Sequence, residues 1–533
     1  MARRVIPTEL VADLRDPALG LPMLRAGLGG LASALRALAP EAARIDGHWT
    51  HQRLPHGETL VDEHRVQLRW ESGKHKEFFG SLFESVFTLC PEHGVIQLAG
   101  TFDPEAPPDL STQVSVQSAM RRTFLQFGPH AKRSKAGPRT VTVTIDDEER
   151  PLKVDSYLDF AHRKEGAQIL LDALKEGRVG VAGYVFPGAV QRHAYLPNTK
   201  YDYSPEQALA ALFSAVGTIS FALPNRGGAL LIPEPTNLTG FAEIRPRLAP
   251  RNFRDARLAG LGDVALRTEL LLKTDEVAKR HAQSIARVHA IRMKTLPWNS
   301  QQKARCETLS MNDIDGDQLD LYEQMREELP SRIYVRKDES DVFDRPSALR
   351  GFVSDNLARA RPWFQGFATA KDGEGRFLHF YAAEGNLGAL RSNERKGLIV
   401  LTQHLAESQE ALVVSVHEAM RHRFGAIASE NAGNAPAMNN RFSRERDRWR
   451  MRFAGAKTLQ QLRGVFADLW SRGGSNDVLQ EHWRSILPLL DDDQWQLARD
   501  LALVAIASYR GRSSAEQEAS NTETNDTEQE QGE

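Results

Sequence analysis

The sequence is poor in cysteine and has no long apolar run. Its 533 residues include only two cysteines, Cys90 and Cys306, which lie far apart in the chain. Such low usage excludes a disulfide framework and is typical of a reducing compartment. No apolar run approaches the length of about 18 residues that a membrane-spanning helix needs, and the basic N-terminus MARRVIPTEL is not followed by the apolar stretch of a secretory signal. We therefore expect a cytoplasmic protein.

The familiar catalytic signatures are also missing. There is no GxSxG, no Walker A sequence and no kinase motif set. The segment HEAMRH places His417 and His422 five residues apart, about 140° around a helix, whereas the zinc protease motif needs a spacing of four. Gly27, Gly29 and Gly30 lack the flanking residues of a nucleotide loop, so close helix packing explains them better. We therefore expect that the protein is not an enzyme and that it holds no cofactor and no resident metal.

One acidic cluster keeps a catalytic alternative open. Asp313, Asp315 and Asp317 have the density of a cation site, but an EF-hand aligned on Gly316 would put Tyr322 where a carboxylate is required. The alternative is a metal-dependent nuclease or hydrolase that uses these three residues, or His417 with Glu418, as ligands. A solvated, capped turn accounts for the same aspartates.

The net charge of −2 conceals a basic body with an acidic tail. The last 21 residues, Ser513–Glu533, contain seven acidic residues and no basic residue. Without them, 68 basic residues face 63 acidic residues, a surplus of five positive charges. Composition of this kind predicts a disordered acidic tail, residues 513–533, on a folded, mildly basic body.

The strongest positive charge lies in Arg441–Arg452, RFSRERDRWRMR. On a helix at about 100° per residue, Arg441, Arg444, Arg448 and Arg452 fall within about 80° of one another. Guanidinium groups suit phosphate, and Trp449 beside them offers a stacking face, so the pattern predicts a nucleic-acid contact. A solvated helix face that keeps the chain soluble is the alternative.

Two further segments combine basic, amide and aromatic residues. A stretch without acidic residues carries Arg121, Arg122, Lys132, Arg133 and Lys135, and we expect its second half to be a loop that touches phosphate or an ordinary surface loop. The second segment contains Trp298, Asn299, Gln301, Gln302, Lys303 and Arg305. These side chains suit base stacking, base-edge reading and phosphate binding. A turn with a packed Trp298 and a helix capped by Asn299 or Ser300 is equally consistent.

The order of predicted elements indicates an α+β protein, with a mixed α/β N-terminal region and a C-terminal helical bundle. Strands and helices alternate in the first half, and residues 252–288 appear largely helical by pattern. Amphipathic helices are predicted at residues 441–470, 478–489 and 493–509, after a small polar linker at 426–438. We expect a large region at residues 1–400, divisible near residue 250, a bundle at 401–512 and the tail.

Several blocks together resemble a known family. LRAGLGGLASALRAL (Leu24–Leu38), GYVFPGAVQRHAYLP (Gly183–Pro197), WNSQQKAR (Trp298–Arg305) and the helical C-terminus occur in the order seen in the large subunit of type I CRISPR effector (Cascade-like) complexes, in its Myxan (Csx-type) branch. The resemblance spans the chain up to about residue 510.

The resemblance implies a non-catalytic subunit of an RNA-guided ribonucleoprotein complex in antiviral defence. Its N-terminal region would recognise the protospacer-adjacent motif in duplex DNA and help to open it. Its helical bundle would contact the displaced strand, stabilise the R-loop and help to recruit the nuclease-helicase. The implied partners are guide crRNA, target double-stranded DNA and the CRISPR backbone subunits. Such families sometimes produce a small subunit from an internal start, for which Met438 is a candidate.

Overall fold

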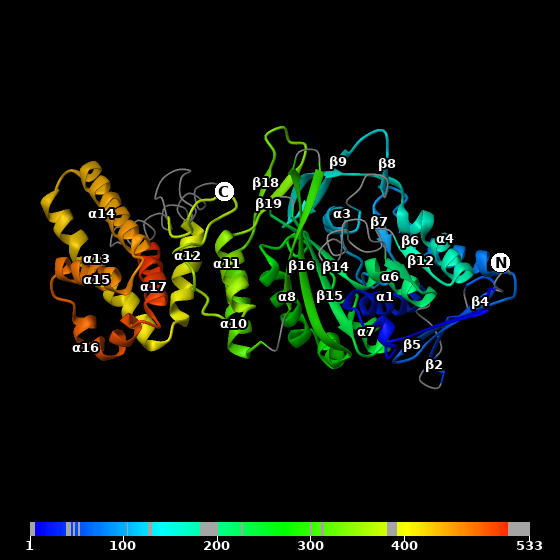
Figure 1. The fold of residues 1–533 in the computed structure, drawn as a ribbon. Coiled ribbons are helices and arrows are strands. Elements are labelled where there is room, and N and C mark those ends of the chain that lie inside the picture. Colours follow the sequence, from blue (N-terminus) through cyan, green and yellow to red (C-terminus); the bar gives the residue numbers. More distant parts are fainter. Residues whose placement is uncertain are drawn as a thin grey trace. The chain divides into compact units, whose positions relative to one another are not determined.

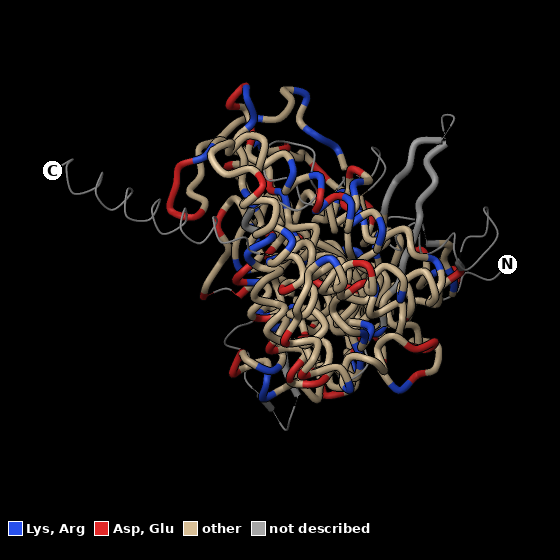
Figure 2. The backbone as a smooth tube through the Cα atoms, turned by 90° about the vertical axis from the view of Figure 1, so that its left-hand side faces the viewer, with Lys and Arg blue, Asp and Glu red and all other residues tan. Residues whose placement is uncertain are grey.

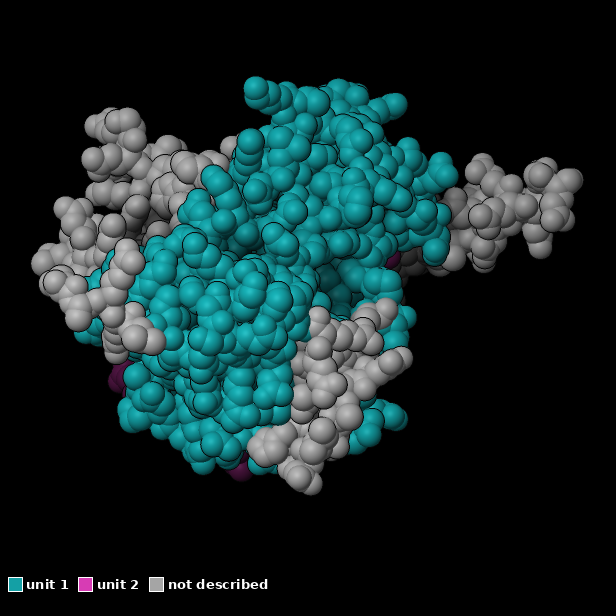
Figure 3. Space-filling view, turned by 90° about the vertical axis from the view of Figure 1, so that its right-hand side faces the viewer, with its two compact units in different colours: residues 1–319, 331–346 teal, residues 320–330, 347–533 magenta. Residues whose placement is uncertain are grey.

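The protein has both helices and strands and divides into two units (Figure 1). The computed structural model describes residues 6–38, 44–45, 48–51, 54–103, 105–125, 131–181, 201–224, 227–298, 301–310, 314–380 and 392–509. Unit 1 comprises residues 1–319 and 331–346, and unit 2 comprises residues 320–330 and 347–533. Figure 3 shows a face formed by unit 1 in teal. The predicted α+β class, with a helical C-terminal region, is confirmed.

Unit 1 begins with a five-stranded antiparallel sheet of order β1-β5-β4-β3-β2. Its strands are β1 (Glu9–Asp13), β2 (Arg44–Ile45), β3 (His48–His51), β4 (Gly57–Val61) and β5 (Arg65–Trp70). Buried and exposed residues alternate along β1 and β5, as expected when one face packs on a core. On that face Trp70 packs against Phe79 of α2 (His75–Val86), with ring centroids 4.9 Å apart.

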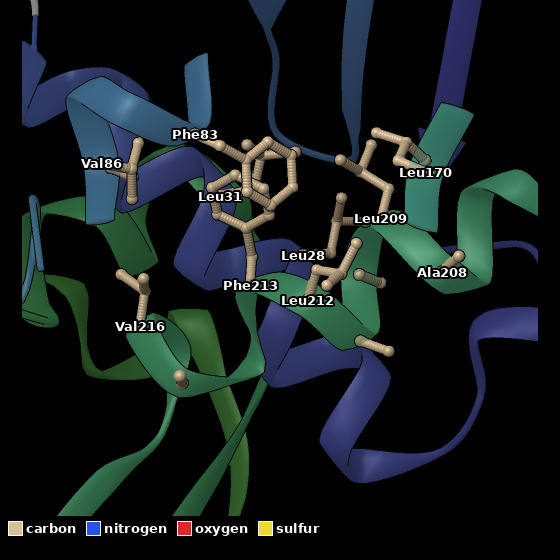
Figure 4. Close-up of a cluster of buried hydrophobic side chains, with 14 of the residues drawn as sticks. Leu28, Leu31, Phe83, Val86, Leu170, Ala208, Leu209, Leu212, Phe213 and Val216 are labelled. Carbon is tan, nitrogen blue, oxygen red and sulfur yellow. The ribbon is translucent and has the colours of Figure 1, made fainter. Parts of the chain in front are cut away.

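Two helices far apart in sequence form the centre of unit 1. They are α1 (Pro22–Leu38) and α6 (Pro205–Gly217). A Cβ atom on Gly27 would lie 1.8 Å from the carbonyl oxygen of Ala210, so the backbones touch directly. Leu28 and Leu31 lie in the same apolar cluster as Phe213 (Figure 4). The prediction that the glycines serve close helix packing is confirmed.

A four-stranded antiparallel sheet follows, of order β14-β15-β16-β17. Its strands are β14 (Ile219–Leu223), β15 (Gly227–Pro235), β16 (Ile285–Trp298) and β17 (Gln301–Ser310). The prediction of helix through residue 288 is therefore wrong beyond residue 284. The prediction of a helix capped near residue 300 is also wrong, because β16 and β17 form a long hairpin in which Trp298 is opposite Gln301.

Shorter elements complete unit 1. The helices are α3 (Leu110–Thr123), α4 (Ala161–Glu176), α7 (Leu238–Ile244), α8 (Leu261–Thr274) and α9 (Glu276–His281). Two-stranded pairings join β6 (Phe87–Leu89) to β7 (Ile96–Leu98), β8 (Ala131–Arg133) to β11 (Tyr157–Phe160), β9 (Arg139–Ile145) to β10 (Glu148–Val154), β12 (Val179–Val181) to β13 (Tyr201–Tyr203), and β18 (Arg332–Val335) to β19 (Val342–Arg345). A second, smaller core joins α3, the β9–β10 hairpin and β19 through Val114, Leu152 and Val342.

Unit 2 ends in a helical bundle, as predicted, but the single helix predicted at residues 441–470 is wrong, because the chain breaks at residues 456–458 between two helices. Its helices are the C-terminal part of α10 (Gly316–Glu328), α11 (Ala348–Leu357), α12 (Ser392–Leu401), α13 (Glu407–Glu430), α14 (Ala435–Gly455), α15 (Leu459–Gly473), α16 (Asp477–Ile486) and α17 (Trp495–Ser508). Helix α13 packs against α15, α16 and α17. Every residue of α17 from Leu501 to Ser508 is buried, which places this helix at the centre of the bundle.

The linker predicted at residues 426–438 is wrong. Helix α13 continues to Glu430, and the side chain of Asn434 caps α14 by accepting a hydrogen bond from the Ala437 amide at 3.1 Å. Met438 therefore lies in the first turns of α14. A product that started at Met438 would lack α13, against which three bundle helices pack, so the fold offers no support for an internal start there.

Among the described helices, none is both long and apolar enough to cross a membrane. The acidic tail, residues 513–533, lies outside the described residues.

Candidate nucleic-acid interface

A basic groove of about 500 Å³ lies on unit 1, between α3, β10 and the β18–β19 hairpin. The lining residues are Val114, Gln117, Ser118, Arg121, Arg122, Leu152, Lys153, Asp155, Arg257, Arg336, Asp341, Val342 and Phe343. Five of these side chains are cationic and two are acidic, a formal surplus of three positive charges. A concave surface with such a surplus attracts polyanions.

Helix α3 forms one wall of the groove. The carboxylate of Asp109 caps the helix by accepting from the Thr112 amide at 2.7 Å. The Gln117 side chain accepts from the Ile96 amide and donates to the Asp155 carbonyl, both at 2.8 Å, which ties α3 to the neighbouring backbone. The last turn of α3 then presents Arg121 and Arg122 to the groove.

The β18–β19 hairpin forms the opposite wall. Strand alternation directs Ile333 and Val342 into the smaller core of unit 1. Tyr334 and Phe343 are directly opposite each other on the other face, with ring centroids 5.5 Å apart and planes inclined by 22°. Phe343 lines the groove and is 44% exposed.

Three contacts fix the position of this hairpin. The Thr140 hydroxyl of β9 donates to the Ser340 carbonyl at 2.9 Å. The Lys153 amide of β10 donates to the Asp341 carboxylate, also at 2.9 Å. The carboxylate of Asp344 accepts from Arg257 at 3.0 Å, and burial raises the pKa of Asp344 while Arg257 opposes that rise. The aromatic wall is therefore held by β9, β10 and a partly buried ion pair.

The cations of the groove are not equally available to a ligand. Arg121 pairs with Asp155, Arg122 donates to the Gly227 carbonyl at 2.9 Å, and Arg257 is held by Asp344. Lys153 and Arg336 are exposed, and neither side chain makes an ion pair or a hydrogen bond within the part of the chain that the structure describes. Of the cations that line the groove, these two therefore have the charge least engaged by other described residues.

The family models match both ends of this chain. One, described as the DevT N-terminal domain, matches residues 11–212, and another, the DevT C-terminal domain, matches residues 402–533. The chain is also 40% identical over 523 residues to the CRISPR-associated protein Cas8a1/Csx13 of Myxococcus xanthus (strain DK1622), an alignment that covers 96% of this chain and 90% of the relative. The chain belongs to the Cas8a1/Csx13 family. The resemblance to the large subunit of type I CRISPR complexes is thereby confirmed.

The groove of this Cas8a1/Csx13 chain draws on segments inside and outside the matched regions. Arg121, Arg122 and Lys153 lie within the part matched by the N-terminal model. Arg257 and Arg336 lie between the two matched parts. Sequence reasoning found Arg121 and Arg122 but missed the other three cations, because acidic residues stand close to each of them in the sequence: Asp155 near Lys153, Asp255 near Arg257, and Asp338 near Arg336.

The remaining residues of the basic N-terminal segment lie on and after β8, and one of them, Arg133, is near a groove residue. Lys132 and Arg133 are exposed on β8, and Lys135 is exposed in the turn that follows. Arg133 lies 3.8 Å from the Asp155 carboxylate and so shares that acidic partner with Arg121. The segment predicted to be a loop thus contains a short strand, and its position next to Asp155 extends the basic surface.

The Trp298–Arg305 block occupies the β16–β17 hairpin. Its strands pair from Trp298 opposite Gln301 to Lys294 opposite Arg305. Asn299 lies outside the described residues, as do the side chains of Trp298, Gln301, Gln302, Lys303 and Arg305. Their role in nucleic-acid binding stays a prediction.

The arginines of α14 are largely paired with acidic residues. Arg441 lies 2.9 Å from Glu430, Arg448 lies 3.8 Å from Glu445, and Arg452 pairs with Asp468. Basic and acidic segments alternate along the tube in Figure 2. Arg444 is exposed and makes no ion pair or hydrogen bond with another described residue. Ion pairing thus leaves Arg444 as the stripe residue with its charge least compensated.

The stacking role predicted for Trp449 is wrong. Its side chain is fully buried, and its Nε1 donates to Glu445 at 3.0 Å. The guanidinium carbons of Arg448 and Arg452 lie 5.4 and 5.0 Å from the Trp449 ring. Trp449 therefore anchors α14 in the bundle and stabilises the stripe by cation–π contacts instead of facing a ligand.

Two residues of the hydrolase alternative, His417 and Glu418, have structural partners. Asp315 and Asp317 are exposed at the start of α10, and Asp313 lies outside the described residues. His417 donates through Nε2 to the Ala505 carbonyl at 2.8 Å, and burial lowers its pKa to about 4. Glu418 accepts from Arg421 at 2.8 Å. Within the described ranges, no group of three or more His, Cys, Asp or Glu side chains could hold a metal ion.

Proposed function

We propose that this chain is the non-catalytic DNA-binding large subunit of a type I CRISPR surveillance complex, and that the basic groove of unit 1 holds the target duplex at the protospacer-adjacent motif. The observation that carries the proposal is the charge surplus of the groove lining, together with two exposed cations, Lys153 and Arg336, whose side chains make no ion pair or hydrogen bond with another described residue. Phosphate contacts of this kind position a protein on DNA and supply most of its non-specific affinity.

The role follows a physical division of labour. In RNA-guided systems, pairing between guide and target reads the sequence, and the protein reads only a short duplex motif. A groove with a few fixed cations suits that task, because it holds a duplex in register without reading a long sequence. The proposed partners are guide crRNA, the target duplex with its displaced strand, the CRISPR backbone subunits and the nuclease-helicase that acts after target binding, all in the cytoplasm.

We assign the displaced strand to the helical bundle. Arg441 and Arg444 are the exposed members of the α14 stripe nearest its N-terminal end. Charge reversal across Arg441, Arg444, Arg448 and Arg452 should weaken DNA binding broadly without altering the preference for an adjacent motif. Reversal of Arg444 alone is the cleanest version, because it breaks no ion pair seen in the described residues.

The decisive experiment reverses the two available cations of the groove. In the purified complex, the double variant Lys153→Glu and Arg336→Glu should weaken target binding by on the order of tenfold per lost phosphate contact near 0.1 M salt. The slope of log K against log salt concentration should also fall in magnitude by about 2, because two counterion-releasing contacts are gone.

The matched control is the double variant Lys76→Glu and Arg163→Glu. These residues are exposed on α2 and α4 of the same unit and do not line the groove, and the change in net charge is identical. Equal losses in the two double variants would show that net charge alone matters, and the groove would then not be the interface. A nuclease assay with and without chelator tests the non-catalytic role, which chelator-sensitive cleavage by the purified chain would contradict.

A further inference from the structure

The groove has an aromatic wall that phosphate binding does not require. Phe343 is 44% exposed and stacks on Tyr334 across the β18–β19 hairpin, at a centroid distance of 5.5 Å. A single exposed ring is ordinary on a protein surface, but this one lines a charged groove together with Arg336. The combination of a flat apolar ring and a neighbouring cation matches the two chemical parts of a nucleotide, a base and a phosphate.

The hairpin's register puts these groups on one face. Phe343 is opposite Tyr334 in the register of the hairpin. The Arg336 amide continues the pairing by donating to the Asp341 carbonyl at 2.9 Å, so alternation puts Arg336 on the same side as the two rings. Lys153 of β10 lines the groove as well, and its amide holds the Asp341 carboxylate at the hairpin turn. Backbone pairing therefore fixes the positions from which the ring and the two cationic side chains extend into the groove.

We propose that Phe343 is a stacking platform for an unpaired DNA base, with Arg336 and Lys153 on the adjoining phosphates. The inference rests on the proposed function, in which this groove holds target DNA, and it adds that the bound form includes a single-stranded segment. A base inside a duplex has both faces covered by its neighbours, whereas an unpaired base has a free face that an aromatic ring can cover. Stacking is tolerant of sequence, because every base has such a face.

The structure favours this occupant over a protein segment. The groove's charge is positive, with five cations against two carboxylates, and one of those carboxylates, Asp155, already pairs with Arg121. The other carboxylate, that of Asp341, accepts from the backbone amides of Lys153 and Val342. The ring thus sits in a field that favours phosphate, and a chain of linked phosphates and bases complements it along its length.

The test uses the full-length chain and a 15-residue oligothymidylate that carries one 2-aminopurine. Stacking on Phe343 quenches 2-aminopurine fluorescence, so titration gives both affinity and stacking. Phe343→Leu keeps an apolar side chain and removes the ring, and we expect roughly 5- to 100-fold weaker single-strand binding with loss of quenching. Phe343→Trp should retain both. Phe343→Leu should weaken binding of a blunt duplex of the same length less than binding of the single strand, because the bases of a duplex have no free face to stack on the ring.

Phe377→Leu is the matched control. Phe377 is 39% exposed, carries a cation–π contact from Lys371 at 4.5 Å, and does not line the groove. Its removal should leave single-strand binding unchanged. Equal effects of Phe343→Leu and Phe377→Leu would overturn the inference.

Other results separate the inference from the proposed function. If Phe343→Leu binds single strands normally while the Lys153 and Arg336 reversal weakens duplex binding, the groove is a DNA interface without a stacking platform, and the inference is wrong. Tighter binding of the matching oligouridylate than of the DNA, with the same Phe343 dependence, would replace the DNA occupant with RNA. Loss of partner subunits from the assembled complex in Phe343→Leu, with unchanged DNA affinity, would make the ring a protein contact.

Discussion

The contact between α1 and α6 provides a sharp test of the fold of unit 1. A Cβ atom on Gly217 would lie 1.7 Å from the Ala26 carbonyl oxygen, whereas real Cβ atoms do not approach other heavy atoms closer than 3.0 Å. Gly217→Ala therefore forces the two helices to move further apart, by about 1.3 Å at this point. The atoms in the way belong to the backbone, so no side-chain rotation relieves the clash.

The energetic cost follows from the packing that the separation disrupts. A gap of about 1 Å removes up to about half of the dispersion energy of each contact along it, and overpacking in cores costs about 1–3 kcal/mol. Because Leu28, Leu31 and Phe213 pack across the same junction, we expect the upper end, about 3 kcal/mol. Hydrogen exchange followed by mass spectrometry measures this locally, and amides of α1 and α6 should exchange about 100-fold faster.

Gly80→Ala is the control for the substitution itself. Gly80 lies inside α2 of the same unit, and a Cβ there meets no atom within 4 Å. Alanine should stabilise that helix by up to about 1 kcal/mol, since it reduces the freedom of the unfolded chain. If Gly217→Ala leaves the exchange of α1 and α6 at the wild-type rate, the close backbone contact does not exist in solution and the reasoning fails.

Three further predictions concern buried polar groups. Trp449→Phe removes the hydrogen bond to Glu445 and should destabilise unit 2 by about 1–3 kcal/mol, with little effect on nucleic-acid affinity. A variant that keeps its stability but binds nucleic acid more weakly would contradict the structural role of Trp449. Burial lowers the pKa of His417 and of His379 to about 4, so the stability of unit 2 should be greatest above pH 6.5. As the pH falls from 6.5 toward 4, each histidine should reduce the free energy of unfolding by about 1.4 kcal/mol per pH unit. Urea titrations at several pH values measure this loss, and His417→Gln should make it less steep. Arg245 donates to three buried backbone carbonyls, and burial lowers its pKa to about 9, so it stays charged at neutral pH. Arg245→Met leaves these carbonyls without a donor and should reduce the free energy of unfolding by about 3 kcal/mol or more, measured by thermal unfolding. An unchanged unfolding transition would refute this role of Arg245.

Some features of this protein could be predicted from its sequence alone. The apolar spacing at 478–489 and 493–509 predicted bundle helices, and the glycines of α1 indicated a close helix contact. Both signals are local in the sequence. A helix repeats every 3.6 residues, and a glycine allows close backbone approach because it has no Cβ atom. The single helix predicted at 441–470 is instead two helices, α14 and α15, that are separated at residues 456–458. Dispersed blocks of sequence also carried the family resemblance, which the relative's 40% identity confirms.

Periodicity was less reliable where tertiary pairing competed with it. The chain around residue 285 reads as helix by pattern, yet it joins β15 in a sheet, because the ladder with β15 and β17 supplies hydrogen bonds that a short helix there would have to replace. The expected linker before α14 is likewise helix as far as Glu430, since the small residues Ala426 and Ala428 are strong helix formers and α13 also packs against its neighbours.

The sequence by itself determined the class of the fold, the bundle helices, the charge of the body and the family. Only the tertiary structure decided which charges act together. Lys153, Arg257 and Arg336 lie on segments about 80 to 180 residues apart, and they meet in one groove because α3, the β9–β10 hairpin and β19 share a small core. The arginine stripe of α14 is the strongest signal in the sequence, but three of its four arginines form ion pairs with neighbouring carboxylates. A local run of charge shows what a chain can bind, but the partners of each charge are set by folding, because Coulomb attraction is satisfied first by the nearest opposite charge.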